Sequence, residues 1–210
     1  KRKKWVSIMS GAFPISTSKF ETLGIKSIQN SLISKSLSGK KLSRQIQNQR
    51  FGFTARIITG KRSDVYGELM AFIIKQRSGK EDFTITPPEL ESARGNVSGT
   101  VLVNGVQSVG DTTITVDGMT GTLKAGDFVK FAHDKVYMVV ADVTADGSNE
   151  ATLTIEPPLI SALADDSSVT YDNIPFKVHL TNDVQEFGTV GADKDGNVLY
   201  QFELDVEETL

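Results

Sequence analysis

Short stretches in which apolar and polar residues alternate dominate this chain, and they predict a mainly β protein. Every second residue of the stretch 51–57 is apolar: Phe51, Phe53, Ala55 and Ile57. The stretches Phe176–Leu180 and Val198–Val206 alternate in the same way. A period of two is that of a strand with one buried face, so each of these stretches predicts a half-buried strand.

Turn residues and prolines indicate where these strands end. Two strands are expected between Leu42 and Ile58, with a break near residues 48–50, and short strands are expected over residues 13–40. The strand Phe83–Thr86 should end at the two prolines that follow it, because proline has no amide to donate to a sheet. The turn-rich segment 193–197 is expected to join the strands of residues 176–180 and 198–206.

One helix is predicted after Ser63. The apolar residues that follow recur at the spacing of one helical face: Tyr66, Leu69, Met70, Ile73 and Ile74. Ser63 is expected to cap the N-terminus, and Gly79 is expected to stop the helix. The stripe predicts packing against the core rather than a cofactor site.

From Gly99 onward, short β-rich stretches recur with turns between them. We expect strands at Thr100–Val103, Thr112–Val116, Phe128–Phe131, Val136–Val143, Ala151–Ile155 and Ser168–Tyr171. This spacing is typical of a small barrel or sandwich. The predicted organisation is a flexible basic N-terminus (1–12), a β-rich core domain (13–92 plus 173–210) and an inserted small β domain (99–172).

The charge is unevenly divided along the chain. Residues 1–80 hold 17 Lys/Arg and three acids, whereas residues 81–210 hold six Lys/Arg and 23 acids, within a net charge of -3. Such polarity fits subunits that associate basic face to acidic face, a nucleic-acid-binding half, or two separately solvated surfaces. Few aromatic residues lie among the basic ones, which disfavours base stacking.

Candidate chemistry is sparse, and no catalytic residue, metal ligand or cofactor is predicted. The chain has no Cys and two His, so disulfides, thiolate chemistry and Cys-ligated metals are excluded. The sequence has no G-x-S-x-G motif that would supply a nucleophilic serine as a catalytic partner for His133 or His179. Asp165-Asp166 and the segment at Asp193 are better explained as turns than as an acid–base pair or a calcium loop. No apolar run approaches the roughly 20 residues of a membrane span.

Several stretches resemble structural tail proteins of tailed bacteriophages, of the distal-tail or baseplate-hub type. In the core they are Gln49–Thr54, Tyr66–Phe72, Phe83–Pro88, Val184–Phe187 and Leu199–Asp205. In the insert they are Ser98–Gly105, Leu123–Phe131 and Val136–Val139.

This resemblance implies a tail-tube-like β-sandwich core with a flanking helix, interrupted by the inserted β domain. It implies a non-enzymatic ring, a hexamer, that joins the tail tube to baseplate or host-adhesion proteins in the virion tail. The protein would be made in the host cytoplasm, meet other tail proteins, and touch DNA only in passage. The insert would project outward as a docking or carbohydrate-binding-like module.

A ring needs a head-to-tail interface, and the charge asymmetry offers complementary faces for it. We therefore expect basic residues of the first half to face neighbouring subunits and acidic residues to face the channel. The residues expected at this subunit interface are Arg44, Arg50, Arg56, Lys61 and Arg62. The alternative function is a nucleic-acid- or glycan-binding β module.

Overall fold

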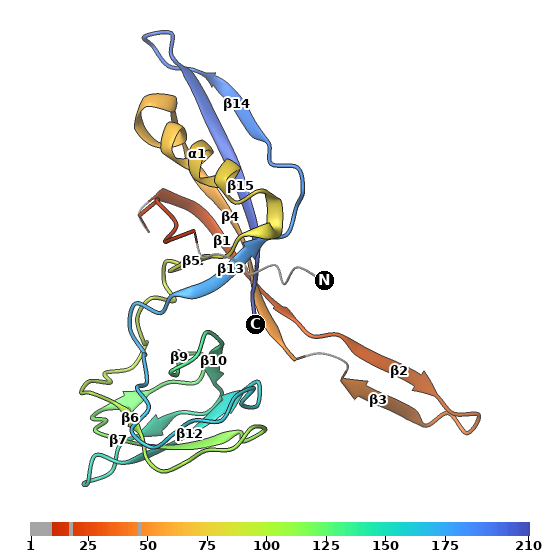
Figure 1. The fold of residues 1–210 in the computed structure, drawn as a ribbon, viewed down its shortest axis with the longest axis vertical. Coiled ribbons are helices and arrows are strands. Elements are labelled where there is room, and N and C mark those ends of the chain that lie inside the picture. Colours follow the sequence, from red (N-terminus) through yellow and green to blue (C-terminus); the bar gives the residue numbers. More distant parts are fainter. Residues whose placement is uncertain (1–9, 17–18, 46–47) are drawn as a thin grey trace, which may run out of the picture.

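The computed structural model describes residues 10–16, 19–45 and 48–210 (Figure 1). Strands of the first group are β1 (Phe20–Ile28), β2 (Ser31–Lys35), β3 (Lys41–Gln45), β4 (Arg50–Lys61), β5 (Phe83–Ile85), β13 (Phe176–Leu180), β14 (Phe187–Ala192) and β15 (Val198–Glu208). Strands of the second group are β6 (Leu102–Val103), β7 (Thr113–Asp117), β8 (Thr122–Leu123), β9 (Phe128–Lys130), β10 (Val136–Val139), β11 (Val143–Thr144) and β12 (Ala151–Glu156). The α-helix of the described residues is α1 (Gly67–Lys75). The mainly β class with one α-helix and an inserted small barrel is confirmed.

A six-stranded antiparallel sheet forms the first unit, in the order β1-β4-β15-β13-β5, with β14 added beside β15. The predicted alternation explains its buried face. Phe51, Phe53, Ala55 and Ile57 of β4 are 0–3% exposed, and the alternate residues of β15 are buried beside them. The layer over this face consists of α1 and of side chains from β9 and β10 of the insert.

The helix begins differently from the prediction. Residues Arg62–Tyr66 form a π-helical turn that leads into α1, and Lys61, not Ser63, occupies the capping position without a side-chain hydrogen bond. The Ser63 hydroxyl instead contacts the carboxylate of its neighbour Asp64. The predicted apolar stripe does pack on the sheet, since Tyr66, Leu69 and Ile73 are buried.

The end of the helix also needs a correction. The turn out of α1 is made by Arg77 and Ser78, which have positive φ angles of 54° and 60°. Gly79 has a negative φ, and a Cβ there would lie 2.4 Å from the carbonyl oxygen of Leu180. Glycine is therefore required at this position by the close approach of another chain segment and not by the helix terminus.

A separate two-stranded hairpin, β2–β3, projects away from the rest of the molecule (Figure 1). We call residues 31–45 the arm. It leaves the sheet between the paired residues Ile28 of β1 and Arg50 of β4. Every residue of β2 and β3 is exposed. Residues 46–47 of the expected strand pattern lie outside the described residues.

The insert is a small barrel built from a five-stranded sheet in the order β6-β7-β12-β10-β9. The strand predicted at Ser168–Tyr171 is absent from the described structure, where this segment forms isolated bridges: Ser168 pairs with Leu102 of the edge strand β6, and Thr170 pairs with Lys130 of the other edge strand, β9. These bridges link the segment to both edge strands of the five-stranded sheet. The stretch predicted as one strand from Val136 to Val143 divides into β10 and β11, and β8, which was not predicted, pairs with β11.

Two segments connect the barrel to the sheet and lie side by side. Ser92 bridges to Asp172, and the amide of Asn173 donates to the carbonyl of Glu91. The buried apolar side chains form two clusters, one under the six-stranded sheet and one inside the barrel. The domain boundaries given above stay a prediction.

The sequence pattern missed β14. The turn at Asp193–Asn197 joins β14 to β15, whereas we expected it to join β13 to β15. The strand Phe187–Ala192 contains two glycines and has only intermediate or exposed residues, so no alternation marks it. The predicted flexible N-terminus falls mostly on residues 1–9, outside the described residues. Residues 10–12 lie along β5, where Ala12 bridges to Thr84.

Candidate functional site: assembly surfaces and a buried junction

Three of the basic residues expected at a subunit interface form ion pairs within the chain. They lie at Arg50, Arg56 and Lys61 of β4, and their partners are Glu207 (2.7 Å), Glu203 (2.6 Å) and Asp193 (2.5 Å). Antiparallel pairing places Arg56 directly opposite Glu203 of β15 and brings Arg50 near Glu207 of the same strand. Asp193 reaches Lys61 from the turn between β14 and β15. The three basic residues could therefore enter an interface only by exchanging partners, and their assignment to one stays a prediction.

These ion pairs shift the titration of the groups that form them. The hydrogen bond and charge of Glu203 raise the pKa of Arg56. Hydrogen bonds from Lys61 and Asn197 hold the pKa of Asp193 well below its usual range. The Asp193 carboxylate also accepts the amide of Asp195, so this segment is an ordinary hairpin turn, as predicted.

The other two expected interface residues are placed differently. Arg44 lies on the arm, opposite Leu32 of the neighbouring strand. Arg62 is exposed beside a shallow hollow that Lys61, Asn197 and other residues line. Within the described residues, neither arginine has an ion-pair partner. The structure thus brings Arg62 next to Lys61 and sets Arg44 apart from the rest of the group.

The arm combines positive charge with exposed apolar side chains. Its charged residues are Lys35, Lys40, Lys41 and Arg44, without an acidic residue. Among the described residues, no acid pairs with any of these four. Leu32, Ile33, Leu37 and Leu42 are 52–111% exposed. Cross-strand pairing places Leu32, Leu42 and Arg44 on one face of the hairpin.

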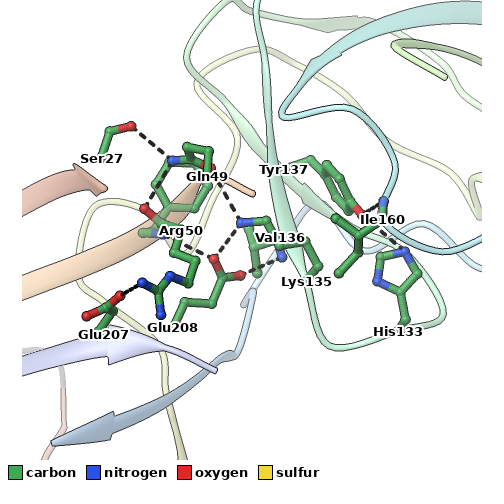
Figure 2. Close-up of polar contacts among 11 residues, drawn as sticks. Ser27, Gln49, Arg50, His133, Lys135, Val136, Tyr137, Ile160, Glu207 and Glu208 are labelled. Atoms are coloured by element: carbon green, nitrogen blue, oxygen red, sulfur yellow. Dashed lines mark hydrogen bonds and ion pairs between the residues drawn. The ribbon is translucent and has the colours of Figure 1, made fainter. Parts of the chain in front are cut away.

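A buried polar junction connects the barrel to the sheet (Figure 2). Lys135, just before β10, donates to the carboxylate of Glu208 at 2.5 Å, and both side chains are fully buried. The Glu208 carboxylate also accepts the amides of Val136 (2.9 Å) and Phe51 (3.1 Å). One carboxylate of the sheet therefore holds both a side chain and a backbone amide of the barrel.

Gln49 extends this network to the root of the arm. Its side-chain oxygen accepts from Lys135 at 3.5 Å, and its amide nitrogen donates to the hydroxyl of Ser27 at the end of β1 (Figure 2). Burial lowers the pKa of Lys135, while the charge and hydrogen bond of Glu208 oppose this shift. A buried charge needs such a partner, because desolvation is not otherwise compensated.

Aromatic rings pack around the junction and seal it from solvent. The Lys135 ammonium lies 4.6 Å from the ring centroid of Phe51. The rings of Phe51 and of Phe128 in the barrel meet in a T-shaped arrangement with their centroids 5.2 Å apart, and the centroids of Phe128 and Phe176 are 5.6 Å apart. The apolar and polar contacts together fix how the barrel sits on the sheet, which positions any surface the barrel presents.

Burial disfavours the protonated form of a histidine near the junction. Nε2 of His133 lies 3.3 Å from the hydroxyl of Tyr137, which accepts the amide of Ile160 (Figure 2). Nδ1 of His133 is buried without a hydrogen-bond partner among the described residues. Burial lowers the pKa of His133, and the charge of Lys130 adds to this effect. Burial also raises the pKa of Tyr137 to about 12.

Lowering the pH from about 7 to about 5 is expected to reduce the free energy of unfolding through His133. The pKa of His133 in the folded state lies below its ordinary value of 6.5. As the pH falls through this range, His133 binds a proton more readily in the unfolded chain than in the folded one, which favours unfolding. The contribution of His133 to the free energy of unfolding is fully present above pH 6.5 and is lost as the pH falls below this value. Thermal unfolding of the wild type and of His133→Gln, each referred to pH 8, measures this effect. Parallel pH curves would contradict it.

An acidic groove lies beside β14, at the opposite end of β4 from the arm. We call it the β14 groove. Its volume is about 330 Å³, and its lining comprises Asn182, Val184, Gln185, Glu186, Gly188, Thr189, Val190, Gln201 and Glu203. Val184 is 82% and Val190 55% exposed. The carboxylates of Glu186 and of nearby Asp183 have no ion-pair partner among the described residues.

The described residues offer little for metal or membrane chemistry. Among them, no three side chains of the His, Asp and Glu types gather as a metal site would require. No helix in this part of the chain combines the length and apolar character needed to cross a membrane. Asp165 accepts the amide of Gly105, and Asp166 has a φ of 61°, which agrees with the predicted turn there.

The comparison with protein families gives a match in the insert. Residues 90–174 match the family described as the distal tail protein pb9, B domain. This match confirms the resemblance to phage distal tail proteins and supports a structural role in the virion tail. Proteins of this kind are in general non-enzymatic. No curated protein matches the chain significantly.

Proposed function

Because residues 90–174 match the B domain of a phage distal tail protein, we propose that this chain forms a ring in the phage tail tip. The ring, a hexamer, joins the tail tube to baseplate or host-adhesion proteins. The six-stranded sheet with residues 13–92 and 173–210 is the ring-forming domain, and residues 99–172 are the inserted domain. The chain contributes contacts and shape, and no catalysis.

The observation that carries this proposal is the exposed arm. A two-stranded hairpin without a third strand or a helix is marginally stable in water. The arm nevertheless presents Leu32, Ile33, Leu37 and Leu42 to solvent. A partner that covers these side chains would remove apolar surface from water and stabilise the hairpin. A second copy of the chain supplies such a partner in a ring.

The charges support the same proposal. The four cations of the arm have no acidic partner in the part of the chain that the structure describes, whereas Arg50, Arg56 and Lys61 of β4 pair with acids. Of the expected interface residues, Arg44 and Arg62 thus have no ion-pair partner among the described residues, and Arg44 is the one that lies on the arm. An arm that reaches from one copy to a different surface of the next makes a head-to-tail interface, and such an interface forms a ring when the rotation between copies closes.

An arm-shortened variant tests the proposal. Residues 31–45 are replaced by an Asn-Gly turn, and assembly is followed by sedimentation velocity and negative-stain electron microscopy at low and high salt. We expect rings for the wild type, weaker association at high salt, and association weakened by at least about tenfold in the variant.

Circular dichroism and thermal unfolding provide the control, because the shortened variant should retain the folded sheet and barrel. Wild-type protein that stays monomeric at every concentration and salt would contradict ring formation. Rings of unchanged stability in the shortened variant would contradict the role of the arm.

Nucleic-acid binding is the second candidate function, because the four unpaired arm cations could neutralise phosphates. The absence of aromatic residues from 31–45 disfavours base stacking. Binding through the arm would give a slope of about −3.6 for the logarithm of affinity against that of salt concentration. A mobility-shift assay between about 50 and 200 mM salt measures this slope, and we expect no shift.

The remaining alternative is that the insert is a carbohydrate-binding module. Binding of the protein to a glycan array tests it.

A further inference from the structure

The proposed ring leaves open which surface receives the arm. Resting on that proposed function, we propose that the arm of one copy docks into the β14 groove of the next copy. The leucine face of the arm meets the apolar side chains of the groove, and the arm cations meet its carboxylates.

The arm and the β14 groove lie too far apart in the fold for the arm to reach the groove of its own chain. The arm leaves the sheet beside Arg50, at the start of β4. The groove lies beside Gln201 and Glu203 of β15, and β15 pairs there with the far end of β4, near Ile57. Figure 1 shows the arm and β14 extending from opposite ends of the sheet. An arm that points away from its own β14 fills this groove only in a second copy.

Apolar surface is present on both sides of the proposed contact. The groove exposes Val184 and Val190, whose side chains are 82% and 55% exposed. The arm offers Leu32 and Leu42 on one face of its hairpin. Neither set has enough neighbours in its own chain to leave water, and their contact would bury both.

The charges of the two surfaces are opposite. The arm carries four cations and no acid. The groove is lined by Glu186, which has no ion-pair partner in the described residues, and by Glu203, which pairs with Arg56. Asp183, also without such a partner, lies in the chain between the lining residues Asn182 and Val184. Complementary charge orients an encounter and excludes wrong partners. Docking would give the unpaired charges of both surfaces their counterparts.

Backbone groups add a further contact. β14 pairs with β15 along one edge only. Its other edge has no strand partner among the described residues, so it can accept an added strand. Both strands of the arm are likewise paired on one side only. The arm can thus extend the sheet of the neighbouring copy while its side chains enter the groove.

Two other hollows on this unit are less suited to the arm. The hollow beside α1 is lined by Lys61 and Arg62, which would repel a cationic arm. The hollow along β1 contains Glu21 and Glu89, but its most exposed apolar side chain, Ile25, is 45% exposed. The β1 hollow and the acidic barrel are therefore the alternatives that the experiment must separate from the β14 groove.

Engineered cysteines test the contact directly, because the chain has no Cys of its own. The double variant Leu42→Cys/Val190→Cys is assembled and oxidised. We expect covalent ladders that end at the ring order, and monomers after reduction. The matched controls are Leu42→Cys/Ile25→Cys for the β1 hollow and Leu42→Cys/Val106→Cys for the barrel. Efficient cross-linking in a control, with none at Val190, would overturn the proposal.

Charge reversal gives an independent reading. Lys41→Glu/Arg44→Glu on the arm and Asp183→Lys/Glu186→Lys at the groove should each weaken assembly by about tenfold or more. The combination of all four changes should restore it to within about threefold. A groove variant that assembles like the wild type would overturn the docking site and leave the ring intact. A wild type without rings would instead contradict the proposed function.

Discussion

Lys135→Ala is expected to lower the free energy of unfolding by about 3–5 kcal/mol, because it leaves the Glu208 carboxylate buried without its cation. Both side chains are fully buried, and the carboxylate also accepts the amides of Phe51 and Val136. Chemical unfolding followed by circular dichroism measures the loss. Hydrogen exchange should show faster exchange at these two amides.

Lys124→Ala is the matched control for this prediction. Lys124 also belongs to the barrel and pairs with Asp142 at 2.8 Å, but both side chains are largely exposed. Solvent screens such a pair, so its removal should have a much smaller effect. The double variant Lys135→Ala/Glu208→Ala should lose less than the sum of the single losses. Equal losses for Lys135→Ala and Lys124→Ala would show that the junction does not stabilise the fold.

Phe176→Ala is expected to lower the free energy of unfolding by about 3–5 kcal/mol through the cavity that it leaves. The Phe176 ring is fully buried, and its centroid lies 4.8 Å from that of Phe53 and 6.2 Å from that of Phe51. It also contacts Phe128 at 5.6 Å, so the change loosens the contact between barrel and sheet. Phe176→Leu fills more of the space and should lose clearly less.

The control for this prediction is Val106→Ala, at a side chain that is 76% exposed on the barrel. A surface change of this kind should stay within about 0.5 kcal/mol. Unfolding is followed by more than one probe, because a chain with two hydrophobic clusters can depart from two-state behaviour. A loss at Phe176 as small as at Val106 would contradict the central place of this ring.

Alternation in the sequence was sufficient to predict the buried faces of β4, β13 and β15. Extended by one step, it also places Gln49 and Glu208 on those faces, because Gln49 precedes Phe51 by two residues and Glu208 follows Val206 by two. The two polar members that the sheet contributes to the junction were therefore accessible in principle. Lys135 was not, since it lies between a bend at residues 132–134 and the start of β10, where the sequence pattern predicted no strand residue.

The ion pairs of the expected interface residues could not be predicted from local sequence patterns. Composition along the chain correctly identified a basic first half, and it grouped Arg44 with Arg50, Arg56 and Lys61. The fold separates them, because it brings Glu203 and Glu207 of β15 and Asp193 of the preceding turn against three of these cations. Sequence distance between these partners exceeds 100 residues in each case, so charge counts in windows could not reveal the pairs.

The sequence by itself determined the β class, the helix stripe, the inserted barrel and its phage-tail resemblance, because these depend on local periodicity, turn residues and motif content. Only the tertiary structure decided that the arm stands free, that β14 is an edge strand beside an acidic groove, and that Lys135 meets Glu208. Each of these features is a relation between residues far apart in the chain. Such relations follow from strand pairing and packing, which short-range patterns do not specify.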